Sequence, residues 1–275
     1  MKDIWEEQLK WLESGEPFVL ARVIRTWRSA PRKSGAGMLI GKGTAKDSLP
    51  KVLGSVSGGC IEGAVIEEAL DVLESEKSRK LSFGVEDDLA LSVGLSCGGE
   101  VSVLLEKHWA FSTMPATKKV WNALQNCIRN NEPAILISAL PDESRASADN
   151  KSPLLILPEG ENVGGMQNNL EEASALAKEA YKERENRIVE IGGEEYFMQI
   201  FPRRDQLLII GAGHITIPLV RFAKELDFLT VVIDPRTVFA NPERFPVPPD
   251  QLISKWPDDV LPDFPLNEDT YAILL

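Results

Sequence analysis

A glycine-rich turn between a wholly apolar strand and a helix constrains the fold of this chain more than any other feature. Residues 207–214 read LLIIGAGH, a helical stretch follows, and residues 229–236 read LTVVIDPR. Two apolar segments joined through a helix are typical of a βαβ unit whose parallel strands are buried on both faces. The sequence therefore predicts an α/β protein whose C-terminal part is a Rossmann-like domain with a doubly wound parallel sheet.

The turn of this unit begins a dinucleotide-binding fingerprint. Gly211 would make the turn, Gly213 would let a pyrophosphate approach the backbone, and Asp234 would accept a hydrogen bond from a ribose hydroxyl. Arg236, two residues further on, could instead meet a 2′-phosphate. His214 opens the helix and is expected to be a cap-region or ligand-edge group. These five residues are the candidates for NAD(P) binding.

The rest of the C-terminal part departs from a regular Rossmann domain. Thr216 stands where the fingerprint has its third glycine, which predicts looser packing of the helix on the strand. The proline-rich segment 241–265 can form neither a regular helix nor a central strand, and 270–275 is one more apolar strand. Because a doubly wound sheet normally has further strands, we expect this domain to be incomplete, either shortened or completed by another chain.

The first 201 residues predict a separate α/β domain. Strands are expected at 18–27, 38–41, 51–58, 98–107, 133–140 and 154–158, with a hairpin at 188–201 around Gly192 and Gly193. Helices are expected between the cap Asp3 and Gly15, and at 61–75, 115–130 and 168–187. The polar stretch PRRDQ (202–206) is a plausible connector, so the predicted domains are 1–201 and 202–275.

Composition excludes several classes of protein. The net charge of −12 disfavours nucleic-acid binding, because such a surface repels phosphate backbones. The chain has no apolar run long enough for a transmembrane helix, and its acidic N-terminus lacks a signal-peptide core. Three widely spaced cysteines do not form a disulfide framework and fit a reducing compartment. These observations predict a cytoplasmic protein.

The segment GSVSGGCIEG (54–63) is the first candidate site. Gly58 and Gly59 would let successive N–H groups converge into an anion-binding nest at the start of a helix. Cys60 lies at that helix terminus, where a thiolate is favoured, and Glu62 lies in the first turn, where an acid complements the helix dipole. The same pattern also fits a strand-to-helix turn with a small buried cysteine.

The segment SCGGEV (96–101) repeats the pattern where a strand begins. Glycine before a strand lets a ligand or another backbone come close, which makes Cys97, Gly98 and Gly99 candidates. Two Cys-Gly-Gly elements in one segment of the chain favour the hypothesis that both loops line one pocket. Cys127, within a predicted helix, is most simply a core residue.

A cluster of cations stands out in so acidic a chain. It comprises Arg22, Arg25, Arg28, Arg32 and Lys33. Arg22 and Arg28 alternate with apolar positions, which is typical of a solvated strand face. Arginine forks also bind phosphate and carboxylate groups bidentately, so the cluster could be an anion clamp, with Arg32 in the basic loop as a candidate. Both interpretations are open.

Five segments, taken in order, closely resemble the XdhC/CoxI family of xanthine dehydrogenase accessory proteins: GSVSGGCIEGAV, FGVEDDLALSVGLSCGGEV, LLIIGAGHITIPLVRFA, VVIDPR and FANPERFP. The basic stretch SAPRKSGAGMLI fits the same family. The resemblance implies an N-terminal XdhC/CoxI domain, a C-terminal Rossmann domain and a homodimer. It also implies a chaperone that binds molybdenum cofactor, a molybdopterin, while its terminal sulfido ligand is installed. Delivery to a xanthine dehydrogenase-type molybdenum hydroxylase would follow, and a cysteine desulfurase is a further expected partner.

The resemblance marks Cys60 for cofactor binding, and the residues point to the same site. Molybdopterin carries a phosphate, which suits a glycine nest, and a soft metal, which suits a thiolate. Cys60 would hold the metal, or else transfer or guard sulfur. The chain lacks iron–sulfur cysteines, so we expect a maturation factor rather than the dehydrogenase itself. Two alternatives are an NAD(P)-dependent oxidoreductase and a nucleotide-sensing interaction module.

Overall fold

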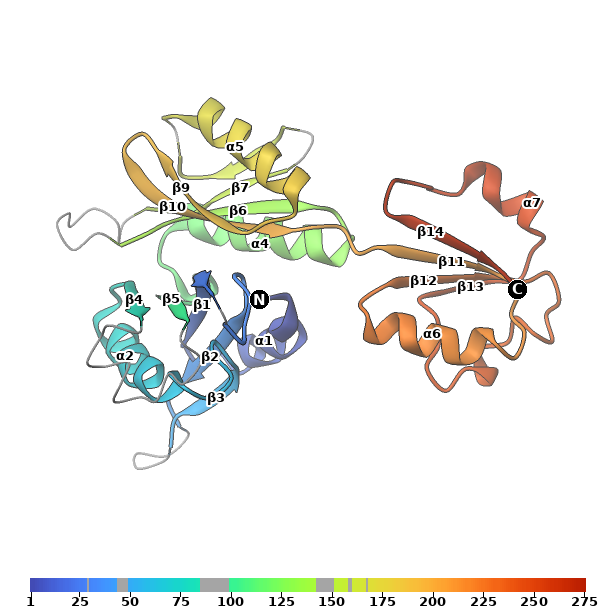
Figure 1. Cartoon of the computed structure of the whole chain (residues 1–275), viewed down its shortest axis with the longest axis horizontal. Helices are drawn as coiled ribbons and strands as arrows, with labels where there is room; N and C mark the ends of the chain where they lie inside the picture. The colour runs from blue at the N-terminus through green and yellow to red at the C-terminus, as the bar shows by residue number, and fades with distance from the viewer. Residues whose placement is uncertain (29, 44–48, 85–98, 142–150, 158–159, 167) are drawn as a thin grey trace. The chain divides into compact units, whose positions relative to one another are not determined.

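The computed structural model describes residues 1–275 except 29, 44–48, 85–98, 142–150, 158–159 and 167. The chain divides into two compact units, Met1–Pro202 and Arg203–Leu275. The first unit contains two five-stranded antiparallel sheets, and the second contains one four-stranded parallel sheet (Figure 1). The predicted fold class, an α/β N-terminal part followed by a Rossmann-like parallel sheet, is confirmed.

The first sheet has β1 at its centre, in the order β3-β2-β1-β5-β4. Its strands are β1 (Phe18–Trp27), β2 (Gly37–Gly41), β3 (Lys51–Gly54), β4 (Arg79–Phe83) and β5 (Glu100–Lys107). Alternate residues of β1 serve two different cores, since side chains alternate across a strand. Val19, Ala21 and Val23 pack with helix α2 (Glu62–Ser75), whereas Phe18 and Leu20 pack on the other face. Both faces of β1 are therefore buried.

The second sheet has the order β8-β7-β6-β10-β9 and is covered on both faces. Its strands are β6 (Ala134–Ala139), β7 (Leu154–Ile156), β8 (Asn162–Gly164), β9 (Arg187–Ile191) and β10 (Glu194–Phe201). Helix α4 (Pro115–Arg129) covers one face and α5 (Leu170–Glu183) the other (Figure 1). Leu136 packs with α4, whereas Ile135 and Ile137 pack with α5. The α4 core also contains Phe18 and Leu20, so it joins the two sheets.

Local details of the first unit differ from the sequence expectations. The strand expected over 51–58 ends at Gly54, whose φ of +82° turns the chain. A Cβ on Gly54 would lie 2.5 Å from the Gly37 carbonyl oxygen, so this position requires glycine. Asp3 does not cap the first helix. A 3-10 turn (Lys2–Ile4) precedes α1 (Trp5–Glu13), and the Asp3 side chain is free to pair elsewhere. A second 3-10 turn covers Trp109–Phe111.

The second unit has the strand order β13-β12-β11-β14. Its elements are β11 (Gln206–Ile210), α6 (Thr216–Glu225), β12 (Leu229–Ile233), β13 (Gln251–Ile253), α7 (Pro257–Val260) and β14 (Thr270–Leu274), with 3-10 turns at Pro242–Arg244 and Leu261–Asp263. The proline-rich segment forms only the edge strand β13 and short turns of helix, as its composition predicts. Across the described residues, no helix has the length and apolar character needed to cross a membrane.

Candidate functional site

The loops that carry the candidate residues leave the same end of the first sheet. Loop 55–61 follows β3, the basic loop 28–36 joins β1 to β2, and Gly99 immediately precedes β5. The registers place these ends together, because Trp27 at the end of β1 pairs with Glu100 at the start of β5. Gly99 is buried there. Two further candidates, Cys97 and Gly98, lie outside the described residues.

The glycine nest exists in the structure, and the side chain of Glu62 fills it. The Glu62 carboxylate folds back from the first turn of α2 onto loop 55–59. It accepts six hydrogen bonds, from the hydroxyls of Ser55 (2.6 Å) and Ser57 and from the backbone N–H groups of Val56 (3.2 Å), Ser57 (2.9 Å), Gly58 (3.1 Å) and Gly59 (2.9 Å). Glu62 therefore serves as the anion of the nest, beyond the helix-dipole role expected for it.

The hydrogen bonds to Glu62 decide its charge state. Burial raises the pKa of Glu62, but the hydrogen bonds from Ser55 and Ser57 outweigh that effect and lower the pKa to about 2. The carboxylate is thus ionised under ordinary conditions and tightly held. A phosphate could enter this nest only by displacing it, so the expectation that the nest itself binds a cofactor phosphate does not fit the structure.

Cys60 lies between the nest and the core of the first sheet. Its side chain is partly buried against the hydrophobic residues around α2, and it forms no disulfide. Its backbone N–H donates to the Ser57 hydroxyl at 3.0 Å, which fixes the backbone just before α2 begins. The thiol is therefore held in place without being sealed in the core. Cys127, in contrast, is buried in the α4 core as predicted, and burial raises its pKa.

Arg22 corrects one interpretation of the basic cluster. Its side chain is fully buried, so it does not lie on a solvated strand face. It forms an ion pair with Glu106 of β5, and it donates hydrogen bonds to Ser138 Oγ of β6 at 2.8 Å and to Gln199 Oε1 of β10 at 3.1 Å. Arg22 is a carboxylate clamp, but the carboxylate belongs to this chain, and the clamp ties the two sheets together.

The same polar network fixes the basic loop. Gln199 Nε2 donates to the Gly35 carbonyl at 3.2 Å, and Asn186 Nδ2 donates to the Ser34 carbonyl at 2.8 Å. Gly35 has a φ of +91°, and a Cβ there would lie only 2.3 Å from Asn186 Nδ2. The second sheet therefore holds the loop in one conformation. No sequence signal marks Gln199 or Asn186 for this task.

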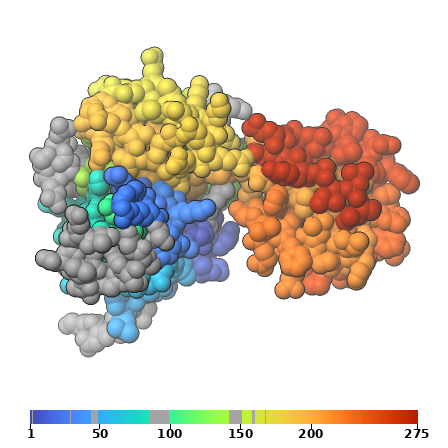
Figure 2. Space-filling view, viewed as in Figure 1, coloured from blue at the N-terminus to red at the C-terminus, as the bar shows by residue number. Residues whose placement is uncertain are grey.

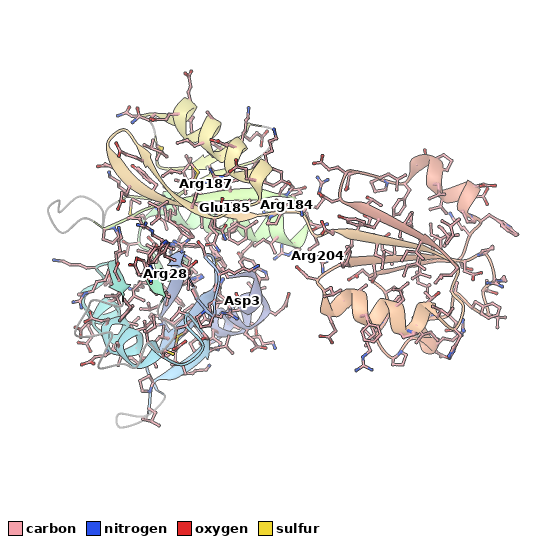
Figure 3. All side chains as sticks on the ribbon, viewed as in Figure 1. Asp3, Arg28, Arg184, Glu185, Arg187 and Arg204 are labelled. Atoms are coloured by element: carbon pink, nitrogen blue, oxygen red, sulfur yellow. The ribbon has the colours of Figure 1, made fainter. Side chains whose placement is uncertain are left out.

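Arg32 lies near the surface of this loop. Its guanidinium pairs with Asp3, and both side chains are about one-third exposed. Figure 3 labels Asp3 near the start of the chain. Its Nε is shielded from solvent and has no hydrogen-bond partner among the described residues. Neighbouring Lys33 is exposed. In Figure 2, blue atoms of the N-terminal part of the chain lie on the visible surface. A Cβ on Gly58 would lie 3.5 Å from Pro31, so the basic loop lies near the nest.

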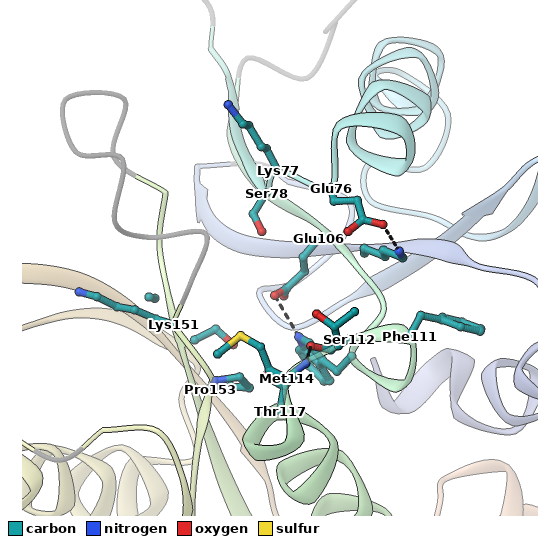
Figure 4. A pocket seen from close by; sticks show the side chains of 15 residues that line it. Glu76, Lys77, Ser78, Glu106, Phe111, Ser112, Met114, Thr117, Lys151 and Pro153 are labelled. Atoms are coloured by element: carbon teal, nitrogen blue, oxygen red, sulfur yellow. Dashed lines mark hydrogen bonds and ion pairs between the residues drawn. The ribbon is translucent and has the colours of Figure 1, made fainter.

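A cavity of about 380 Å³ opens beside the basic loop. It is lined by residues of the loop, of the first turn of the chain and of the second sheet, including Asp3, Arg32, Lys33, Asn186 and Gln199. Another cavity, of about 490 Å³, lies at the opposite end of β5 (Figure 4). Glu106, Trp109 and Ser138 line that second cavity, with Glu106 accepting a hydrogen bond from the Trp109 ring nitrogen at 3.0 Å. Only the first cavity adjoins the candidate loops.

In the second unit, Asp234 is already engaged by this chain. The buried carboxylate accepts hydrogen bonds from the Ala212 N–H at 2.8 Å and from the Arg236 guanidinium at 2.9 and 2.7 Å. The bonds from Arg236 are the main reason that the pKa of Asp234 falls well below its usual range. Gly213 has open space where a Cβ would be, and His214 is exposed. NAD(P) binding here stays a prediction, and it would require Asp234 to exchange its partners.

Gly211 and Thr216 close the turn of the fingerprint. Gly211 has a φ of +110°, and a Cβ there would lie 2.6 Å from the Leu275 carbonyl oxygen. Thr216 is fully buried, and its hydroxyl donates to the Gly211 carbonyl at 2.6 Å. The expectation that threonine loosens the packing of helix and strand is therefore wrong, because the hydroxyl ties α6 to the turn.

We expect Thr216→Val to lower the local stability of the second unit by about 1–2 kcal/mol, because it keeps the shape and removes the hydrogen bond. Hydrogen exchange of strand β11 measures this change. Thr216→Ser is the matched control, since it keeps the hydroxyl. Equal protection of β11 in the valine variant and the wild type would show that the bond contributes nothing.

A metal bound at the candidate site would need ligands from elsewhere. Within the described ranges, no three His, Cys, Asp or Glu side chains come together in the way that a protein metal centre needs. Cys60 is a single thiol, which can complete the coordination of a metal that arrives with its own ligands.

Two domain models of one family match the chain in order. Residues 11–84 match the model described as the XdhC and CoxI family, and residues 207–275 match the model described as the XdhC Rossmann domain. The first match contains the nest, Cys60 and the basic loop, and the second contains the fingerprint. The two matches therefore cover the described candidate residues in both units except Gly99.

Relatives and a solved structure agree with these matches. A protein of Bacillus subtilis (strain 168), named as a probable xanthine dehydrogenase subunit, is 26% identical over 260 residues, which are 92% of this chain and 70% of the relative. The molybdenum cofactor insertion chaperone PaoD of Escherichia coli (strain K12) is 33% identical over 35% of this chain and 28% of the relative. A crystal structure described as a xanthine dehydrogenase from Bacillus halodurans matches 98% of this chain and 73% of its own, with a TM-score of 0.71 and 26% identity. The chain belongs to the XdhC and CoxI family.

Proposed function

We propose that this protein is an accessory chaperone of xanthine dehydrogenase maturation. It binds molybdenum cofactor, supports sulfuration of the cofactor and inserts it into a xanthine dehydrogenase-type molybdenum hydroxylase. The assignment of molybdenum cofactor is supported by the name of PaoD, a molybdenum cofactor insertion chaperone. The assignment of the partner enzyme is supported by the name of the Bacillus subtilis relative, a probable xanthine dehydrogenase subunit. In this proposal the protein works in the cytoplasm as a homodimer, with a cysteine desulfurase as the sulfur source.

The observation that carries the proposal is the partly exposed Cys60 thiol, which lies between the nest and the core of the first sheet. Glu62 and Ser57 fix the backbone on both sides of this residue, so the position of the sulfur is preorganised. When bound, the cofactor would supply a molybdenum atom held by soft sulfur ligands, and a thiolate is the soft donor that this chain can add. Such a site can hold and release its cargo without turnover of its own.

We expect Cys60→Ser to retain less than about one-tenth of the molybdenum cofactor that the wild type retains, because a hydroxyl is a poor ligand for a soft metal. The measurement is the fluorescence of oxidised pterin released from purified protein, together with the molybdenum content. The circular dichroism spectrum should not change, since the side chain is only partly buried.

Cys127→Ala is the matched control for the loss of a thiol. It should retain cofactor normally, although it loses some stability because Cys127 lies in the α4 core. Equal retention by Cys60→Ser and the wild type would remove the role assigned to Cys60. Pterin-free wild-type protein that also fails to take up added cofactor would remove the proposed function as a whole.

A further inference from the structure

We infer that Arg32 and Lys33, at the edge of the cavity beside the basic loop, bind the phosphate group of the cofactor. The identity of the ligand rests on the proposed function. The place of the phosphate rests on the geometry of the nest, of the Asp3–Arg32 pair and of the loop. The glycine nest, which sequence alone would assign to this phosphate, is excluded by its own occupant.

The first step of the argument is that the nest is not available. A phosphate entering it would compete with a carboxylate that is part of the chain and that accepts six hydrogen bonds. Hydrogen bonds to a charged acceptor are among the stronger ones in proteins. An intramolecular anion also has an entropic advantage over a ligand that must be captured from solution. The phosphate therefore binds elsewhere.

The second step is that two cations of the basic loop can accept it. The Asp3–Arg32 pair is about one-third exposed on both sides, and pairs this exposed change an equilibrium constant by about fivefold at most. A phosphate carries close to two negative charges and offers the paired oxygens that a guanidinium prefers. It can displace Asp3 from Arg32, whose Nε is without a partner in the described part of the chain. Lys33 adds a second charge and has no ion-pair partner among these residues.

The third step is that the backbone after Lys33 is anchored and that the loop lies near the nest. Asn186 and Gln199 hold the carbonyls of Ser34 and Gly35, so the cations precede an anchored stretch of backbone. A Cβ built on Gly58, two residues before Cys60, would lie 3.5 Å from Pro31 of this loop. The adjoining cavity of about 380 Å³ has room for a small polar group. One ligand can therefore place its metal end at Cys60 and its phosphate at the loop.

The test compares metal-free molybdopterin with the same compound after a phosphatase has removed its phosphate. Pterin fluorescence measures the dissociation constant of each form, and the absence of metal removes any contribution from Cys60. The wild type should bind the phosphorylated form at least about tenfold more tightly. The double variant Arg32→Gln/Lys33→Gln should bind both forms with the weaker constant. Asp3→Asn should strengthen binding of the phosphorylated form about threefold, because the competing carboxylate charge is gone.

Arg129→Gln is the matched charge control, since this residue is exposed and, in the described part of the chain, its side chain hydrogen-bonds only to Asn126 of its own helix. It should preserve the preference, and melting temperatures should show that all variants fold. An unchanged preference for the phosphorylated form in the double variant overturns the phosphate site and leaves the proposed function standing. Wild-type protein that binds neither form overturns both.

Discussion

Replacing Arg22 with methionine is expected to lower the free energy of unfolding of the first unit by about 3–5 kcal/mol, the largest stability effect that we expect in this protein. Arg22 is fully buried, and its removal leaves the Glu106 carboxylate, which is also largely buried, without a positive partner. The hydrogen bonds to Ser138 and Gln199 are lost at the same time. Breaking a buried pair costs more than the pair contributes, because one charge remains desolvated.

Urea unfolding followed by tryptophan fluorescence measures this effect, since five of the six tryptophans belong to the first unit. Arg25→Met, on the exposed part of the same strand, is the control and should change stability by less than about 0.5 kcal/mol. Adding Glu106→Gln to Arg22→Met should restore part of the loss, because no unpaired charge then remains. A stability loss in Arg22→Met no greater than in the control would mean that the clamp does not hold the two sheets.

Glu62→Gln is expected to abolish retention of cofactor and to cost about 2 kcal/mol of stability. The amide has the same shape, but it loses the charge and turns an NH₂ group toward the N–H donors of loop 55–59. The amide oxygen can still accept in place of one carboxylate oxygen, but the Gly59 N–H and the Ser57 hydroxyl, which donate to the other oxygen, then face the NH₂ group. The backbone before Cys60 is therefore held less firmly. The value of about 2 kcal/mol takes into account that solvent screens a carboxylate that is only partly buried.

The stability difference between wild type and Glu62→Gln should depend on pH in one direction. The pKa of Glu62 is lowered from 4.5 to about 2 on folding, so the folded state favours the ionised form. The contribution of the ionised Glu62 carboxylate to the free energy of unfolding is fully present above pH 4.5, and it decreases as the pH falls from 4.5 toward 2. Urea unfolding at a series of pH values from about 7 to about 2.5 measures this decrease.

Glu67→Gln is the matched control on the same helix, because Glu67 is exposed. Its retention of cofactor and its pH profile should match those of the wild type. A difference between wild type and Glu62→Gln that stays constant across this pH range would show that the ionised carboxylate is not what holds the loop.

Much of the fold is predictable from local pattern. The apolar run and glycine turn at 207–214 predict a parallel strand entering a helix, and the prolines of 241–265 exclude a regular helix and a central strand, as the structure shows. Some short strands escape prediction. β4 and β8 have five and three residues, and they pair only because neighbouring strands offer free edges. Length alone is not the reason, because the equally short β7 (LLI) is predicted from its apolar residues, whereas β4 (RKLSF) and β8 (NVG) are edge strands with mostly polar or small residues.

The candidate site is likewise predictable from the sequence only in part. Glycines followed by a cysteine and a helix predict converging N–H groups around residue 60, since backbone conformation depends on local sequence. The sequence does not show which anion those N–H groups hold. In the structure it is the carboxylate of Glu62, whose side chain folds back onto the loop. Thr216 shows the same limit. The sequence shows that the third glycine of the fingerprint is missing, but only the structure shows that the Thr216 hydroxyl donates to the Gly211 carbonyl and ties the helix to the turn.

The sequence by itself determined the architecture, the family and the glycine-rich turn before Cys60, because periodicity and glycine placement act through local backbone geometry. Only the tertiary structure decided which charges are paired. Arg22 meets Glu106, 84 positions away, and Gln199, 177 positions away, and Arg32 meets Asp3 across 29. The physical reason is that charge interactions depend on distance and burial in space, and no local pattern in the chain encodes either of them.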